Sequence, residues 1–243
     1  TLDIELQNKL YSLFKEDEGQ VVCIDPSNGD ILALMSFPSF DPNEFVQGIA
    51  SASYQALLDD SRLPLWNKFQ PSYAPGSTMK IPTAMAGFNA GILSPGTTKT
   101  IIGKTWQPDA SWGPYEIARF TVDDSPQDLS RAIVISDNIY FAQVALEMGR
   151  DVFQEQLSNL GFTDEVPSSY PFPAAQFANS GSIGDTVMLA TSSYGQGEIM
   201  VTSTQMACIY AAIAANGDIP APRLLMSDEV AIWKENVISD SNR

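Results

Sequence analysis

One segment restricts the possible folds more than any other: a Pro75-Gly76 pair stands directly before an apolar stretch that begins at Ser77 and carries Lys80 three residues later. A Pro-Gly pair favours a turn, and the apolar residues that follow recur at helical spacing. The sequence therefore predicts a helix that begins near Ser77 and ends within 91–95. The first N–H groups of a helix lack intrahelical acceptors and favour negative charge. Lys80 lies one turn from Ser77 on the same face, which makes the two residues a candidate nucleophile and general base.

The chain contains no histidine. A Ser-His-Asp triad and a zinc site built on histidine are therefore excluded. A nucleophilic serine here needs another base, and lysine can supply one, because a partly buried ammonium loses proton affinity and the neutral amine then accepts a hydroxyl proton. Taken alone, a Ser-x-x-Lys pattern is common by chance. A capping serine followed by a solvated lysine would give the same spacing.

A second polar group, Ser136-Asp137-Asn138, stands 59 residues after Ser77. It separates two apolar segments that predict helices over 128–135 and 139–149. A polar triplet at such a break can point a hydroxyl and an amide into a cleft. We expect Ser136 to relay a proton to a leaving amine, and Asn138 to hold the lysine and a substrate amide. Capping of the second helix is the alternative for the triplet alone, but its combination with Ser-x-x-Lys favours an acyl-transfer site.

The remaining pattern predicts an α+β fold (an α/β sandwich) with a helical lobe, in one large domain or two small ones. Asn28-Gly29 between two β-rich runs is typical of a hairpin turn, and Asn216-Gly217 is typical of a helix end. The expected elements are a helix over 3–15, strands over 20–25 and 31–36, short helical pieces in 43–70, short strand-like runs in 95–127, and helices over 151–160 and 203–215.

Composition narrows the function classes. The formal net charge is −16, so the clustered Lys and Arg that bind nucleic acid or anionic lipid are not expected. No apolar run approaches the roughly 18 residues of a membrane-spanning helix. Cys23 lies in a run typical of a buried strand and Cys208 in one typical of a helix. Their spacing fits no metal motif, and a disulfide between them stays open.

With both motifs present, the chain resembles the class B penicillin-binding proteins. The resemblance covers essentially the whole chain, residues 1–243, and implies one transpeptidase domain with the penicillin-binding protein/serine β-lactamase-like fold. Further matching runs, in family order, are Thr1-Leu2-Asp3 with Leu6-Gln7, Val21 to Ser36, Pro38 to Asn43, and Tyr194 to Glu198 with Val201-Thr202 and Gln205-Met206-Ala207. The runs most similar to the low-affinity, β-lactam-resistant subgroup of Gram-positive bacteria are Ser111-Trp112-Gly113, Ser136 to Ala142, and Trp233 to Ser239.

This resemblance implies a peptidoglycan D,D-transpeptidase. Ser77 would attack the penultimate D-Ala carbonyl of a stem peptide, with its own N–H in the oxyanion hole, and β-lactams would acylate the same serine. The amine of a neighbouring stem peptide would then resolve the acyl-enzyme. The implied partners are stem peptides, β-lactams and other cell-wall synthesis or division proteins, with no cofactor and no metal. The implied location is the extracytoplasmic face of the bacterial cell membrane, with an N-terminal anchor and a non-catalytic domain before Thr1.

Two further groups are weaker candidates for substrate binding. Tyr194-Gly195-Gln196-Gly197 contains a single Gly-x-Gly, which favours a tight turn beside the cleft over a phosphate cradle. Trp112 can line a substrate groove, although aromatic side chains of this kind are more often part of a core.

The sequence departs from the family in one respect. A Lys-Thr-Gly or Lys-Ser-Gly should follow the second motif, but the nearest dipeptides, Lys99-Thr100 and Lys104-Thr105, precede Ser136 and lack the glycine. We therefore expect a C-terminally incomplete domain without its last sheet strands. Such a chain is expected to be a poor catalyst and an unstable fold by itself.

Three other activities use related motifs. A class A β-lactamase needs a Glu-x-x-Leu-Asn element, and in Glu155-Gln156-Leu157-Ser158-Asn159 the Leu and Asn fall at the wrong offsets. A D,D-carboxypeptidase uses the same chemistry with water as the acceptor, and the class B runs argue against it. A β-lactam sensor carries Ser-x-Val at the second motif, which Ser136-Asp137-Asn138 does not match. A purely structural module stays open only if the third motif was never there.

Overall fold

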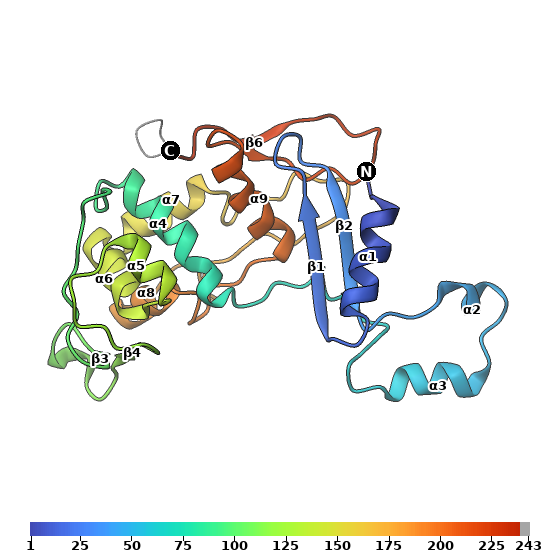
Figure 1. Ribbon diagram of the computed structural model, residues 1–243, viewed down its shortest axis with the longest axis horizontal. Helices are drawn as coiled ribbons and strands as arrows, with labels where there is room; N and C mark the ends of the chain where they lie inside the picture. Colours follow the sequence, from blue (N-terminus) through green and yellow to red (C-terminus); the bar gives the residue numbers. More distant parts are fainter. Residues whose placement is uncertain (239–243) are drawn as a thin grey trace.

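The Asn28-Gly29 turn joins β1 (Gly19–Ile24) to β2 (Ile31–Phe37) as an antiparallel hairpin in the computed structural model, which describes residues 1–238. Gly29 has φ +77°, and a Cβ there would overlap the carbonyl of Ala221, so this turn requires glycine. Helix α1 (Ile4–Phe14) packs on β2, and α9 (Ser203–Ala214) packs on β1 (Figure 1). The hairpin is thus held between two helices from opposite ends of the described chain.

A group of helices gathers on the other side of α9 (Figure 1). Their apolar faces share one core, which includes Met79, Ile139, Phe141, Phe153 and Ile209. The elements are α4 (Lys80–Asn89), α5 (Leu129–Val134), α6 (Asn138–Met148), α7 (Arg150–Asn159) and α8 (Thr186–Ser192), with the short strands β3 (Thr105–Trp106) and β4 (Ile117–Ala118) at the edge. The predicted helical lobe is therefore present.

The helix expected to begin at Ser77 begins differently. Residues Gly76–Met79 form a 3₁₀ turn, and the α-helix starts at Lys80. Pro82 gives the physical reason, because it has no N–H to donate to the Thr78 carbonyl as an α-helix from Ser77 would require. That carbonyl accepts instead from the Tyr210 hydroxyl of α9, at 2.8 Å.

Several elements differ from the sequence-based expectation. Helix α8 and the strands β5 (Ile219–Pro220) and β6 (Ile232–Lys234) were not predicted. Within residues 1–238 the strands form three separate two-stranded sheets, so the fold is mixed α/β with small sheets. The predicted α/β sandwich would have one continuous sheet, and this part of the chain does not form one. Helices α2 (Pro42–Val46) and α3 (Ser51–Asp59) project from the hairpin end (Figure 1). Ser239, the last residue of one family-like run, lies outside the described residues.

The two cysteines are free thiols, Cys23 half-buried in β1 and Cys208 buried in α9. The prediction of small core side chains is confirmed for Cys208 and is only partly met by Cys23. A search of residues 1–238 finds no helix with the length and hydropathy needed to cross a membrane.

Candidate active site

The turn before α4 presents Ser77. Gly76 adopts φ +56°, a left-handed conformation that suits glycine, and the chain then enters the 3₁₀ turn that carries Ser77. Ser77 is exposed, whereas Lys80, at the first position of α4, is only 3% exposed. The Lys80 Nζ lies 3.2 Å from the Ser77 Oγ. An accessible hydroxyl therefore faces a buried amine, as the sequence predicts.

The triplet between α5 and α6 closes around the same amine. Lys80 Nζ donates to the Ser136 carbonyl oxygen and to the Ser136 Oγ, both at 2.7 Å, and to the Asn138 Oδ1 at 2.8 Å. The Ser136 Oγ lies 3.0 Å from the Ser77 Oγ. The structure thus brings Ser77, Ser136 and Asn138 within hydrogen-bond distance of the Lys80 amine, and the catalytic roles of these four residues remain predictions.

The four acceptors around Lys80 are of two kinds. The Ser136 carbonyl and the Asn138 Oδ1 can only accept hydrogen bonds, whereas the hydroxyls of Ser77 and Ser136 can also donate. A neutral amine has two N–H bonds and one lone pair. It can donate to the two carbonyl-type oxygens while its lone pair accepts from a hydroxyl. The same set of acceptors suits the three N–H donors of the ammonium, and in the neutral form it lets the lone pair accept from a serine hydroxyl.

Burial favours the neutral amine. Desolvation lowers the pKa of the Lys80 ammonium to about 8, and the Asp137 carboxylate opposes this shift. At neutral pH about a tenth of the molecules would carry the free amine. Lys80 Nζ also lies 5.8 Å from the centre of the Phe141 ring. The pocket therefore supplies a base whose pKa lies near the working range of a general base.

The amide of Asn138 is held in one orientation. Its Nδ2 donates to the Ala118 carbonyl oxygen of β4 at 3.0 Å, which leaves the Oδ1 facing Lys80. Ser136 adopts φ +55°, an uncommon conformation for a residue other than glycine. Strained residues of this kind persist only where their surroundings hold them.

The predicted turn at Tyr194 to Gly197 follows α8 and lies directly against the loop before Ser77. The Gly76 N–H donates to the Gly195 carbonyl at 2.9 Å. Gly195 has φ +79°, and a Cβ at this position would overlap the backbone of Gly76. Tyr194 is buried, and this burial raises the pKa of its phenol. The turn thus supports the loop that carries Ser77, and a role of Tyr194 or of the exposed Gln196 and Gly197 in substrate binding stays a prediction.

Trp112 lies in the hydrophobic core, at 7% exposure. Its ring packs on Trp106 and Tyr115, and its Nε1 donates to the Thr186 Oγ1 at 2.9 Å. These contacts agree better with Trp112 as a core residue than with Trp112 as part of the wall of a substrate groove.

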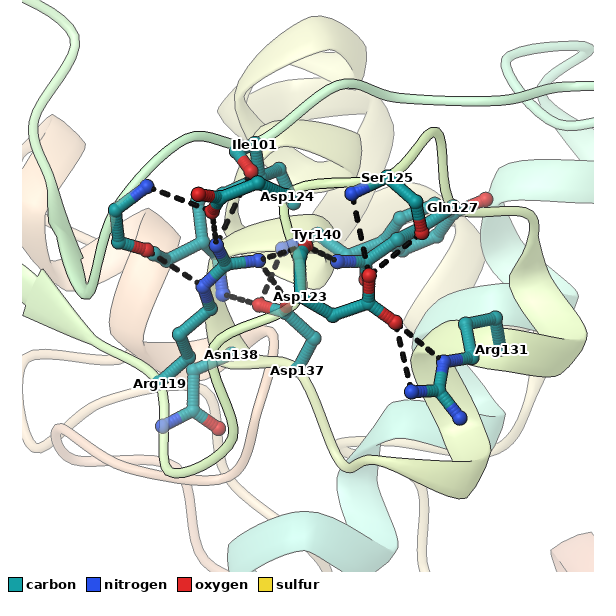
Figure 2. Close-up of polar contacts among 12 residues, drawn as sticks. Ile101, Arg119, Asp123, Asp124, Ser125, Gln127, Arg131, Asp137, Asn138 and Tyr140 are labelled. Atoms are coloured by element: carbon teal, nitrogen blue, oxygen red, sulfur yellow. Dashed lines mark hydrogen bonds and ion pairs between the residues drawn. The ribbon is translucent and has the colours of Figure 1, made fainter.

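One feature of the site was missed. Asp137, the middle residue of the triplet, was assigned no role, yet its carboxylate forms a buried ion pair with Arg119 (Figure 2). The sequence offers no signal for this pair, since Arg119 stands in the 95–127 segment of short strand-like runs, where no residue pattern marks a buried charge. Among residues 1–238, no cluster of Cys, Asp and Glu side chains is arranged to hold a metal ion.

Comparison with known proteins identifies the family. A family model described as "Penicillin binding protein transpeptidase domain" matches residues 19–242. The chain belongs to the penicillin-binding protein transpeptidase family. It is 39% identical over 241 residues to penicillin-binding protein 3 of Bacillus subtilis (strain 168), covering 98% of this chain and 36% of that protein. It is 34% identical over 241 residues to the peptidoglycan D,D-transpeptidase MrdA of Salmonella typhimurium (strain SL1344), covering 94% of this chain and 38% of that protein.

A solved structure supports the same assignment. The penicillin G acyl-enzyme complex of penicillin-binding protein A from M. tuberculosis aligns with a TM-score of 0.79 at 26% identity, over 91% of this chain and 54% of that one. The transpeptidase fold and the class B-like membership, predicted from sequence motifs, are thus confirmed. This penicillin-binding protein domain spans between a third and two fifths of the length of the curated relatives.

Proposed function

We propose that this chain is the catalytic domain of a peptidoglycan D,D-transpeptidase in which Ser77 forms the acyl-enzyme. The observation that carries the proposal is the position of the Lys80 amine, which lies within hydrogen-bond distance of both the Ser77 and Ser136 hydroxyls. Family membership supports it, as does the reaction named for the MrdA relative. The histidine-free composition also agrees, because the base must then be another residue.

In the proposed first half-reaction, the neutral Lys80 amine takes the Ser77 hydroxyl proton as Oγ attacks the penultimate D-Ala carbonyl. The new Oγ–C bond gives a tetrahedral oxyanion, and the Ser77 N–H in the first helical turn is placed to stabilise it. The proton then passes from Lys80 through the Ser136 hydroxyl to the leaving nitrogen. The C–N bond breaks and the terminal D-Ala leaves as an amine.

In the second half-reaction, the amine of a neighbouring stem peptide attacks the acyl-enzyme. Its proton returns through Ser136 and Lys80 to the Ser77 Oγ, so the free hydroxyl is regenerated and one peptide bond has replaced another. A β-lactam follows the first half-reaction by opening its ring amide, which leaves the drug attached to Ser77.

Broader features are proposed on the family-like runs. We place residues 1–243 in one transpeptidase domain that acts on the extracytoplasmic face of the bacterial cell membrane, with stem peptides, β-lactams and other cell-wall synthesis or division proteins as its partners. The runs around Trp112, Ser136 and Trp233 support membership of the low-affinity subgroup. A second-order acylation rate with benzylpenicillin in the range of highly sensitive relatives would exclude that subgroup.

Labelling at Ser77 tests the proposal. When the protein is expressed at the full length of its gene and treated with benzylpenicillin, intact mass spectrometry should show one adduct per molecule, and peptide mapping should place it on Ser77. Ser77→Ala should carry no adduct. Ser94→Ala, which removes an exposed hydroxyl bonded to Thr97, should label like the parent. An adduct that persists in Ser77→Ala, or fast release of many hydrolysed drug molecules, would contradict the assignment.

The pH dependence of acylation should follow Lys80. The reactive form is the neutral amine, which predominates above the pKa of about 8, so the rate should rise as pH increases through 8 and level off above it. Stopped-flow measurement of acylation by a fluorescent penicillin, from pH 6 to 10, checks this prediction. A rate that is flat from pH 6 to 9 would contradict the role of Lys80 as base.

A further inference from the structure

Arg119 is a buried arginine whose five N–H groups are all engaged. Its guanidinium is 0% exposed and lies between two carboxylates and three backbone carbonyls (Figure 2). The five acceptors are the carbonyl oxygens of Gly103 (2.8 Å), Ile101 (3.1 Å) and Asp123 (2.9 Å) and the carboxylates of Asp124 (2.7 Å) and Asp137 (3.2 Å). This single side chain therefore joins three segments that are separate in the sequence.

The Asp137 carboxylate is the partner that links Arg119 to the site. It is 0% exposed, and its Oδ1 accepts from the N–H groups of Ile139 at 2.8 Å and Tyr140 at 3.3 Å, which caps α6. Its Oδ2 faces Arg119. A buried carboxylate needs a counter-charge, and Arg119 supplies it. Lys80 is the other cation on which this carboxylate acts.

The main chain at Arg119 also lies beside the triplet. The backbone N–H of Arg119 donates to the Lys104 carbonyl at 3.1 Å, next to the β3–β4 pairing. The preceding residue, Ala118, offers the carbonyl that binds the Asn138 amide. The Ala118–Arg119 peptide therefore links the β3–β4 pairing to the Asn138 end of the triplet through the main chain, whereas the Arg119 side chain reaches the triplet through Asp137.

We propose that Arg119 is a positioning residue for the acyl-transfer reaction, its guanidinium acting through Asp137 to hold the neighbouring Ser136 and Asn138 against Lys80. The inference rests on the proposed function, in which Lys80 is the base. Arg119 does not touch the reacting atoms. It balances a buried negative charge that would otherwise act on the Lys80 ammonium alone.

The charges around Lys80 determine the direction in which each variant should move the pKa of its ammonium. The neighbours of Lys80 within hydrogen-bond or ring distance are uncharged, namely Ser77, Ser136, Asn138 and Phe141. The charged groups behind them are Asp137, Arg119 and Asp124, with Asp123 paired to Arg131. Loss of the Arg119 charge leaves Asp137 free to stabilise the ammonium, whereas loss of the Asp137 charge removes that stabilisation.

The test compares the pH profile of Ser77 acylation by benzylpenicillin in variants of the full-length protein. Arg119→Met should move the rising limb to higher pH by about one unit, and Asp137→Asn should move it to lower pH by a similar amount. Asn retains the ability to cap α6, and Arg119 keeps its Asp124 partner in that variant. Opposite shifts of this kind would not arise from a role in folding alone.

Two more variants make the comparison decisive. Arg119→Lys keeps the charge and loses the planar set of five N–H groups. The rising limb of its pH–rate profile should therefore stay at the parental pH, while the acylation rate on its high-pH plateau falls. Arg223→Met removes a part-buried arginine paired with Asp30, so it is a matched control whose limb should not move. If Arg119→Met does not fold, the test rests on Asp137→Asn. A pH–rate profile of Asp137→Asn whose rising limb lies at the parental pH overturns the inference. A parent that never labels refutes the proposed function itself, whereas a parent that labels with unshifted variants refutes only the role of Arg119.

Discussion

Lys80→Met should slow acylation of Ser77 by a labelled penicillin by about 10²–10⁴-fold, which is the usual contribution of a general base. The methionine side chain has nearly the length of lysine and no charge, so it can occupy the buried position of Lys80 without leaving a cavity. The variant loses the only amine that the structure places near the Ser77 hydroxyl within residues 1–238. Stopped-flow rates at pH 9, where the parental amine is mostly neutral, measure the effect.

The matched control is Lys99→Met. Lys99 is also largely buried, with a side chain 9% exposed, but its Nζ pairs with Glu147 at 2.6 Å. This variant should acylate at the parental rate, and its melting temperature reports any cost of removing a buried lysine. A Lys80→Met protein that acylates within about threefold of the parent would show that another group accepts the proton, because a lost general base costs far more.

The combination of two polar motifs was enough to predict which residues meet, and their catalytic roles remain predictions. The spacing of Ser77 and Lys80 puts them one turn apart, and the break at Ser136-Asp137-Asn138 favours exposed polar groups. Their meeting around one amine is a long-range contact, which the combination of the two motifs led us to expect. Which hydroxyl faces which acceptor could not be predicted. That geometry depends on the left-handed φ of Ser136, which tertiary contacts impose.

The Arg119–Asp137 ion pair could not be predicted from the sequence, because the two residues are 18 positions apart and belong to no shared helical or strand pattern. A charged residue in an irregular segment is usually exposed, and nothing local marks the exception. Three backbone carbonyls of the surrounding segment converge on the Arg119 guanidinium, an interaction that hydrophobic patterns do not encode.

Elements with strong periodicity were predicted best. Helices α1, α6, α7 and α9 begin and end within one residue of their expected bounds, because their apolar residues recur at helical spacing. Helix α8, a seven-residue segment rich in β-branched residues, was missed since its intrinsic helix propensity is low and its buried contacts decide its structure. The strands β5 and β6 were missed because two or three residues are too few to show alternation.

Gly195→Ala should reduce the acylation rate by about 10–100-fold without touching any residue of the proposed mechanism. A Cβ at Gly195 would overlap the carbonyl and nitrogen of Gly76, which are backbone atoms and cannot rotate away. The loop before Ser77 must therefore shift, and displacement of a reacting group by about 1 Å can cost a hundredfold in rate. The measurement is the second-order rate with benzylpenicillin, alongside thermal unfolding.

Gly181→Ala separates this effect from backbone strain. Gly181 has φ +84°, close to the +79° of Gly195, but a Cβ there meets no atom within 4 Å. Both variants carry the cost of alanine in a left-handed conformation, about 1–2 kcal/mol of stability. Only Gly195→Ala pushes on Gly76, so only it should lose acylation rate beyond what its stability explains. Equal acylation rates in the two variants would show that the turn after α8 does not position Ser77.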